Sequence, residues 1–234
     1  MSRRMRCACV LLIVAIVILA ERMSVSVLHA SSSSDGGACV AEMRTTVSAV
    51  TMHLVDRVGL PRQAVTEMMR ETTELWRKAG VDVTWSPLPA LGTEVEVTDG
   101  SHPQMKVIVM RDTPDGLQSI APGVRVMASI LFIDRKPTTL IAAYPAEVER
   151  LLDTVHTDAR PVGERPAALR QRLMGRMLGR AVAHELGHFL FGSADHTPDG
   201  LMRARHRLDD LTSPFSRAFR ILPAQARTSA LGSC

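Results

Sequence analysis

Two histidines and a glutamate in one short segment have the spacing of a metal-dependent hydrolase. The segment HELGHFLFGSADH covers residues 184–196, and His184 and His188 stand four residues apart. On a helix this spacing places both imidazoles on one face, where two ring nitrogens can bind one Zn²⁺ ion. Glu185 is rotated by roughly 100° from His184, so its carboxylate lies beside the ion and can act as general base on a zinc-bound water. The motif therefore predicts a hydrolytic zinc site with Glu185 as its catalytic residue.

A catalytic zinc ion takes three protein ligands and keeps one open position. No glutamate follows Glu185, which excludes a downstream glutamate as the third ligand. Gly192 is expected to end the helix and turn the chain back, because a residue without a Cβ atom readily takes positive φ. That turn lets His196 reach the ion, with Asp195 as the alternative third ligand. Two acids further along the chain are more distant candidates: Asp209 and Asp210.

The segment HELGHFLFGSADH resembles the zinc signature of the metzincins, HExxHxxGxxH, and DGLMRA resembles the methionine turn of that clan, with Met202 beneath the site. The resemblance implies an α+β, zincin-like fold, in which a twisted mixed sheet packs on a long active-site helix above a small C-terminal subdomain. It also implies one zinc ion, peptide or protein substrates and metalloendopeptidase activity. The chain departs from the clan's spacing by one extra residue on each side of Gly192, and Met202 follows His196 by only six residues. It therefore resembles a divergent or minimal metzincin.

Two other functions are compatible with the motif. One is an exported zinc-binding module without catalytic activity. The intact Glu185 argues against this module, because a purely structural zinc ion is closed by four ligands and no spare cysteine stands near the motif. The other is a zinc hydrolase of non-peptide amides, whose substrates the motif does not separate from peptides.

Hydrophobic periodicity predicts the elements that position these residues. Helices are expected at 61–77, at about 146–158 and from residue 167 to 191, and strands at 81–85, 94–98, 106–110 and 127–134. This order of elements is typical of an α+β layer domain. The strand at 127–134 is either a sheet edge that accepts an extended peptide or an internal strand.

Several polar positions receive a structural interpretation. Arginines recur every four residues on the long helix, at 172, 176 and 180, and predict a solvated helix face. The sequence SPFSRAFRI, which begins at Ser213, predicts a short closing helix with Ser213 as its N-cap. His206 is expected in an exposed loop, with a position near the cleft as the alternative.

The N-terminus predicts export. A basic start, MSRRMR, precedes an apolar run from Cys7 to Ala20, which is typical of a secretory signal peptide. We assign residues 1–30 to the signal peptide, 31–59 to a flexible lead and 60–234 to the zinc metallopeptidase domain. The protein is then secreted or periplasmic, and it contacts a membrane only if residues 1–30 stay uncleaved as an anchor.

Charge and cysteine usage complete the prediction. Residues 1–30 hold four arginines and one glutamate, so 24 basic and 23 acidic residues remain after their removal. A chain so close to neutral has no electrostatic footprint for nucleic acid. Cys39 and Cys234 also remain, and in an oxidising compartment they could form one disulfide.

Overall fold

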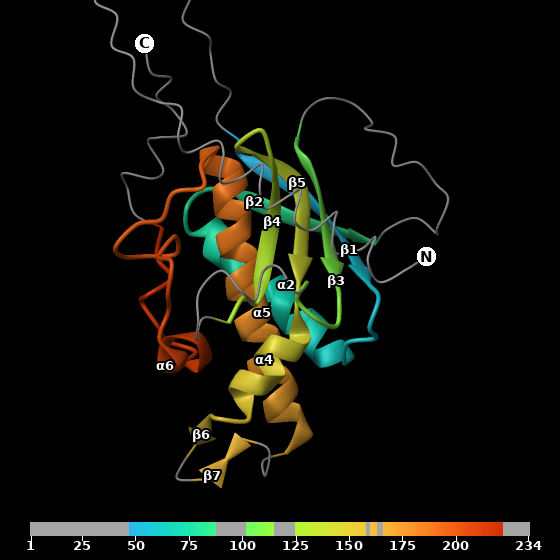
Figure 1. Cartoon of the computed structure of the whole chain (residues 1–234), viewed down its shortest axis with the longest axis vertical. Coiled ribbons are helices and arrows are strands. Elements are labelled where there is room, and N and C mark those ends of the chain that lie inside the picture. Colours follow the sequence, from blue (N-terminus) through green and yellow to red (C-terminus); the bar gives the residue numbers. More distant parts are fainter. Residues whose placement is uncertain (1–46, 88–101, 115–124, 158–159, 163–165, 222–234) are drawn as a thin grey trace, which may run out of the picture. The chain divides into compact units, whose positions relative to one another are not determined.

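The computed structural model describes residues 47–87, 102–114, 125–157, 160–162 and 166–221. Within these ranges the chain forms a five-stranded mixed sheet and a long helix, so the α+β class is confirmed (Figure 1). The predicted signal peptide, the strand expected at 94–98 and both Cys39 and Cys234 lie outside the described residues. No helix in the described ranges has the length and apolar character needed to cross a membrane.

The described elements follow one another as β1 (Ala49–Asp56), α2 (Arg62–Arg77), β2 (Asp82–Pro87), β3 (Gln104–Val109), β4 (Ala128–Ile133), β5 (Lys136–Ala143), α4 (Pro145–Leu152), β6 (His156–Thr157), β7 (Arg160–Pro161), α5 (Ala167–Phe191) and α6 (Leu208–Thr212). The strand order in the main sheet is β2-β1-β3-β5-β4. The first four of these strands are parallel, and β4 is antiparallel to β5. β4 is thus an edge strand of the described sheet, one of the two alternatives that the sequence left open.

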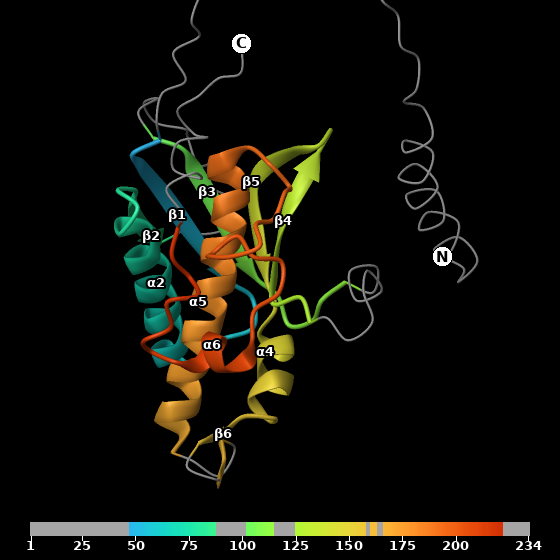
Figure 2. The same cartoon turned by 90° about the vertical axis from the view of Figure 1, so that its left-hand side faces the viewer.

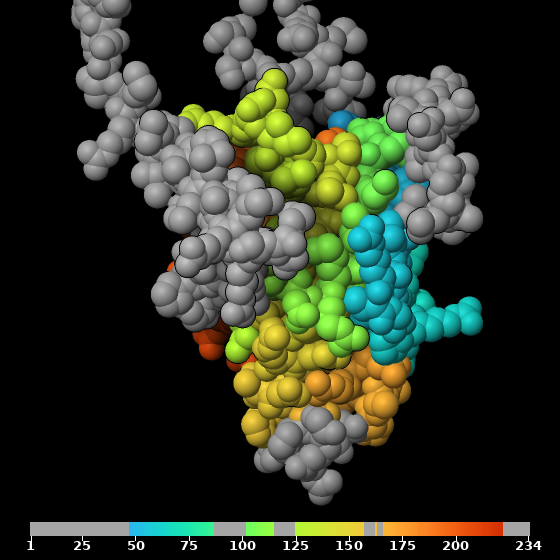
Figure 3. Space-filling model, turned by 45° about the vertical axis from the view of Figure 1, so that its right-hand side comes forward, coloured from blue at the N-terminus to red at the C-terminus, as the bar shows by residue number. Residues whose placement is uncertain are grey.

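Helices α2 and α5 cover one face of the sheet side by side (Figure 2). The core lies between this helix pair and the sheet, and its fully buried side chains include Met52, Val107, Ile141, Met68 and Leu178. Both helices start directly after a proline, as their sequences predict, and both match the predicted ranges within a residue. The hairpin that joins β4 to β5 projects at one end of the molecule (Figure 3).

Strand β1 corrects the predicted start of the domain. The sequence predicts a flexible lead over residues 31–59, whereas β1 lies inside the sheet between β2 and β3. Val50 and Met52 are buried, and Leu54 packs against the core. The period-two alternation of these three residues was the signal that could have revealed the strand. The folded domain therefore begins by residue 49 and not at residue 60.

Strand β5 is not among the strands predicted from the sequence, because its first four residues, KPTT at 136–139, have the composition of a turn. The turn lies two residues earlier, at Asp134 and Arg135, which have positive φ values of 50° and 62°. Two consecutive left-handed residues form the tight hairpin turn that suits twisted antiparallel strands. Lys136 consequently starts β5 and pairs with Ile133.

Two glycines on α5 bring it into close contact with α2. A Cβ atom on Gly179 would lie 2.7 Å from the Met68 carbonyl oxygen, and one on Gly175 would collide with the Ala64 carbonyl. The missing side chains let the two backbones approach closely. The arginines that follow each glycine are thereby drawn into the contact between the helices.

The predicted solvated arginine face is wrong for two of its three members. Arg172 is exposed, but Arg176 and Arg180 are buried. Arg176 forms an ion pair with Glu67 of α2 at 3.2 Å, and Arg180 forms one with Glu71 at 2.7 Å. Burying a charge costs free energy unless it is paired, and the glutamates of α2 supply the partners.

The closing helix also differs from the prediction. The helix observed here is α6, which ends at Thr212 with Ser213 as its C-cap, whereas the sequence predicts that Ser213 begins a helix. Arg176 donates to the Thr212 carbonyl at 2.8 Å, and Arg180 donates to the carbonyls of Asp210 and Ser213. Carbonyl groups at the end of a helix need such partners, so the buried arginines fix where α6 stops.

Candidate metal centre

Three histidines converge at the C-terminal end of α5. The ring nitrogens that His184, His188 and His196 offer lie within 4.8 Å of one another. The first two come from successive turns of α5, and their Nε2 atoms are 3.1 Å apart. Gly192 ends α5 with a φ of 63° and turns the chain back. The His196 ring consequently stacks on His184, with a centroid distance of 5.2 Å, and meets His188 at right angles.

Backbone carbonyls orient both helical histidines. His184 Nδ1 donates to the Leu201 carbonyl at 2.8 Å, and His188 Nδ1 donates to the Ser193 carbonyl at the same distance. A carbonyl can only accept, so both protons belong on Nδ1 and both Nε2 atoms carry lone pairs. Two lone pairs that face each other at 3.1 Å repel unless a cation lies between them. A metal-binding histidine usually binds the ion through one ring nitrogen and donates the N–H of the other to a carbonyl or a carboxylate, as both Nδ1 atoms do here.

Burial keeps the three imidazoles neutral. It lowers the pKa of His184 to about 3, although the bond to Leu201 opposes this shift. Burial also lowers the pKa values of His188 and His196 below the ordinary value for histidine. Neutral imidazole is the form that binds a metal ion, so no proton has to be displaced.

The donor set fits zinc. A tetrahedral zinc ion with nitrogen ligands at ~2.0–2.1 Å separates those nitrogens by about 3.3 Å, close to the distance between the two Nε2 atoms. Imidazole nitrogens suit zinc and other transition metals, whereas calcium and magnesium require oxygen ligands. In the described ranges the cluster contains three histidines and no carboxylate.

The alternative third ligands lie outside this cluster. Asp195 is exposed, and its carboxylate accepts a hydrogen bond from the Ser193 hydroxyl at 2.8 Å. Asp210 is on α6, where it accepts from the Ser216 hydroxyl at 3.0 Å, and Asp209 is on the same short helix. The structure thus brings His196, and not these acids, to the two helical histidines.

Glu185 faces the edge strand of the sheet. The Ile130 N–H of β4 donates to Glu185 Oε2 at 2.8 Å. Burial raises the pKa of Glu185 to about 8, and the bond from Ile130 opposes this shift. A carboxyl group with a pKa near neutrality can both accept and release a proton, which is what general acid–base catalysis requires.

Met202 lies directly against the motif. Its side chain is buried, and its sulfur occupies the space that a Cβ atom on Gly187 would need. The Thr197 N–H donates to the Met202 carbonyl at 2.9 Å, which closes the loop between the third histidine and the methionine. Met202 therefore packs against α5 at Gly187, between the two helical histidines.

Two polar residues near the site were not assigned from the sequence. His206 is half-buried, in contrast to the exposed loop position expected for it, and its ring stacks on Phe219. Tyr144 is buried, and its hydroxyl is 2.8 Å from the Ser129 hydroxyl. Burial raises the pKa of Tyr144, with a smaller contribution from the charge of Glu185. No spacing pattern could have revealed either residue, because their partners are distant in the sequence.

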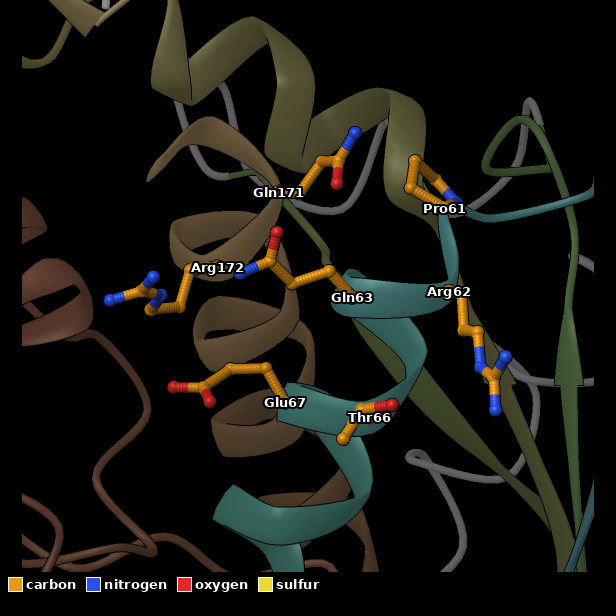
Figure 4. A pocket seen from close by; sticks show the side chains of 7 residues that line it. All are labelled: Pro61, Arg62, Gln63, Thr66, Glu67, Gln171 and Arg172. Atoms are coloured by element: carbon orange, nitrogen blue, oxygen red, sulfur yellow. The ribbon is translucent and has the colours of Figure 1, made fainter. Parts of the chain in front are cut away.

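A separate pocket of about 630 Å³ lies between the first turns of α2 and α5 (Figure 4). Its lining side chains are Pro61, Arg62, Gln63, Thr66, Glu67, Gln171 and Arg172. None of the three histidines lines this pocket, so it does not belong to the candidate metal centre.

Comparisons with known proteins found similar folds but no sequence family. No protein-family model matches the chain, and no curated protein matches it. Among solved structures, it is similar to archaemetzincin from Methanopyrus kandleri, with 16% identity over 80% of this chain and 95% of that chain and a TM-score of 0.41. It is also similar to a zinc-dependent peptidase from Methanocorpusculum labreanum, with 13% identity over 78% of this chain and 100% of that chain and a TM-score of 0.44.

Proposed function

We propose that this chain is a zinc-dependent peptidase in which His184, His188 and His196 hold the ion. The observation that carries the proposal is the convergence of three histidine ring nitrogens within 4.8 Å, on the helix segment that also carries the Glu185 carboxyl group. Three nitrogen ligands leave one position of a tetrahedral ion free, as catalytic zinc sites do. A structural zinc site would need a fourth protein ligand, and the described cluster has three.

Glu185 is the proposed general base. Bound zinc would supply Lewis-acid polarisation of the scissile carbonyl and of the attacking water. Glu185 would accept the proton of that water and then deliver it to the departing amine. The Ile130 N–H holds one carboxylate oxygen, which fixes the orientation of the side chain during both transfers.

The edge strand supports a peptide as substrate. Ile130 belongs to β4, and its N–H points to Glu185 instead of to the neighbouring β5. An extended chain that paired with this edge of the described sheet would therefore run past the proposed catalytic carboxylate. This alignment favours a peptide over a compact non-peptide amide.

We further propose that the domain acts outside the cytoplasm. The support is the sequence of residues 1–30, with its basic start, its apolar run and the small residue Ala30 at the expected cleavage point.

Incubation of the purified zinc-loaded protein with a denatured protein mixture tests the proposed activity. We expect cleavage that stops when a chelator removes the metal. Glu185→Gln should keep zinc and lose cleavage by about 10²- to 10⁴-fold, the usual contribution of a general base. His188→Ala is the matched control, because it should lose the metal itself.

Three results would contradict parts of this proposal. Cleavage that survives the chelator would exclude the metal. Undiminished cleavage by Glu185→Gln would exclude the assigned base. A zinc-loaded protein that cleaves nothing would favour a non-catalytic zinc-binding module.

A further inference from the structure

The Leu201 carbonyl has a second hydrogen-bond donor besides His184. His206 Nε2 lies 3.3 Å from this oxygen, and His184 Nδ1 lies 2.8 Å from it. The two rings are nearly perpendicular, with centroids 6.4 Å apart. One carbonyl therefore joins a proposed zinc ligand to a fourth histidine that is not in the three-histidine cluster.

The Leu201 peptide is held on its other side by the C-terminal segment. Its N–H donates to the Arg220 carbonyl at 2.9 Å, and the Leu201 side chain is fully buried. Gly200, directly before it, has a φ of 79°, which forms the tight turn. The carbonyl that orients His184 thus depends on contacts from residues after α6.

Aromatic stacking fixes the His206 ring. It lies 4.4 Å from the centroid of Phe219 at an interplanar angle of 27°. The Arg180 guanidinium lies over the same Phe219 ring, 4.5 Å from its centroid. Arg180 is in turn paired with Glu71. Phe219 therefore contacts both His206 and the arginine of the buried ion pair.

The remaining polar atom of His206 makes no competing bond. His206 Nδ1 is buried and has no hydrogen-bond partner among the described residues. With Nε2 as the donor to Leu201, the ring has one polar contact in this part of the chain. The hydrogen bond by which the His206 ring can orient a neighbouring group is therefore the bond to the Leu201 carbonyl.

Arg180 and His184 are one helical turn apart on the same stripe of α5, and His188 follows one turn later. The segment after α5 runs back along this helix to α6 (Figure 2), where Arg180 donates to the Ser213 carbonyl. The contacts of Phe219 with Arg180 and His206 therefore connect the buried ion pairs to the histidines of the candidate metal centre.

We propose that His206 is a positioning residue of the metal centre: its bond to the Leu201 carbonyl fixes the acceptor that orients the His184 ring. The inference rests on the proposed function, in which His184 binds zinc. Outer partners of this kind typically contribute about 10- to 100-fold to metal affinity.

The test compares zinc affinity, by competition with a chromophoric chelator, and the absorption spectrum of the cobalt-loaded protein. His206→Ala should weaken zinc binding by about 10- to 100-fold and change the cobalt spectrum. His206→Gln should recover most of the affinity, because its amide N–H can reach the place of Nε2. His156→Ala, which removes an exposed histidine of β6, is the matched control and should bind zinc like the wild type.

Wild-type zinc affinity in a folded His206→Ala variant would overturn the inference. It would equally be overturned if His206→Gln bound zinc no better than His206→Ala. Should His206→Ala fail to fold, Phe219→Leu provides the second test, because it keeps apolar volume and removes the stack. We expect weaker zinc binding there as well, and unchanged binding would contradict the inference. A wild-type protein that binds neither zinc nor cobalt would instead contradict the proposed function.

Discussion

The proposed third zinc ligand, His196, is the residue on which the candidate site most depends. His184 and His188 are set by the geometry of α5, whereas His196 reaches them through the turn at Gly192. His196 is exposed, and its neighbour Asp195 was a competing candidate on the sequence alone.

Single replacements of His196 and Asp195 test which of the two residues is the third zinc ligand. His196→Ala should weaken zinc binding by more than the ~100-fold upper range of an outer partner, since it removes a ligand. Asp195→Ala should stay within about 3-fold of the wild type, because the carboxylate bonds to Ser193 instead. Zinc stoichiometry and affinity measure both effects. The reverse order of effects would make Asp195 the ligand.

Gly187 constrains the methionine below the site. A side chain at this position would occupy the space of the Met202 sulfur. We expect Gly187→Ala to lower the free energy of unfolding by about 1–3 kcal/mol through overpacking. Met202→Ala would open a cavity when made alone, yet in the double variant it should relieve the collision. Urea unfolding of all four proteins gives the coupling, and strictly additive effects would contradict this contact.

Among individual residues, the sequence predicted the clustered histidines better than the polar residues around them. The four-residue spacing of His184 and His188 is enough to place both rings on one helix face. The positions of His206 and Tyr144 depend on chain segments that fold back from elsewhere. Their contacts have no local periodicity, so the sequence could not reveal them.

Among the elements, the α2–α5 pair determines where the motif lies. Its two ion pairs join helices that are separated in the sequence by four of the five strands of the sheet, β2 to β5. A row of arginines at helical spacing normally indicates a helix face that is exposed to solvent. Here the adjoining glycines bring α2 close enough to bury two of the three arginines. The misprediction therefore arose because burial of this face depends on a distant partner.

Removal of Arg180 should be far more costly than removal of Arg172. Arg180→Met leaves the buried Glu71 with only its longer contact to Arg70, at 3.4 Å, and we expect a loss of about 3–5 kcal/mol in the free energy of unfolding. Exposed Arg172→Ala should change it by less than about 0.5 kcal/mol. A double variant with Glu71→Leu should regain much of the loss. Urea unfolding checks these values, and equal effects of the two single variants would contradict the buried network.

The predicted elements were most accurate where local signals and tertiary packing agree. Both long helices have a proline before the first turn and a continuous apolar stripe, and both were predicted correctly. β1 and β5 were not predicted because their alternation of buried and exposed residues covers only a few positions. The sequence beside them also has the composition of a flexible lead or of a turn. The end of α6 is set by arginines some 30 residues away, which no local pattern contains.

For the whole molecule, export is the proposal that rests on the N-terminal sequence. Expression of the full chain in a secreting host should yield a protein that begins at Ser31, as N-terminal sequencing would establish. Intact mass before and after reduction would show whether Cys39 and Cys234 pair. A secreted product that keeps residues 1–30 would contradict cleavage, and retention in the cell membrane would indicate an anchor.

The contacts of Phe219 and Arg220 have a practical consequence for handling this protein. Because these two residues support the Leu201 peptide and the His206 ring, the stretch up to Ile221 belongs to the active unit although it contains no helix or strand after α6. A protease that nicked the chain shortly after Thr212 would leave α5 and the sheet in place and still detach the support of the metal site. Truncations for expression or crystallisation should therefore end beyond residue 221.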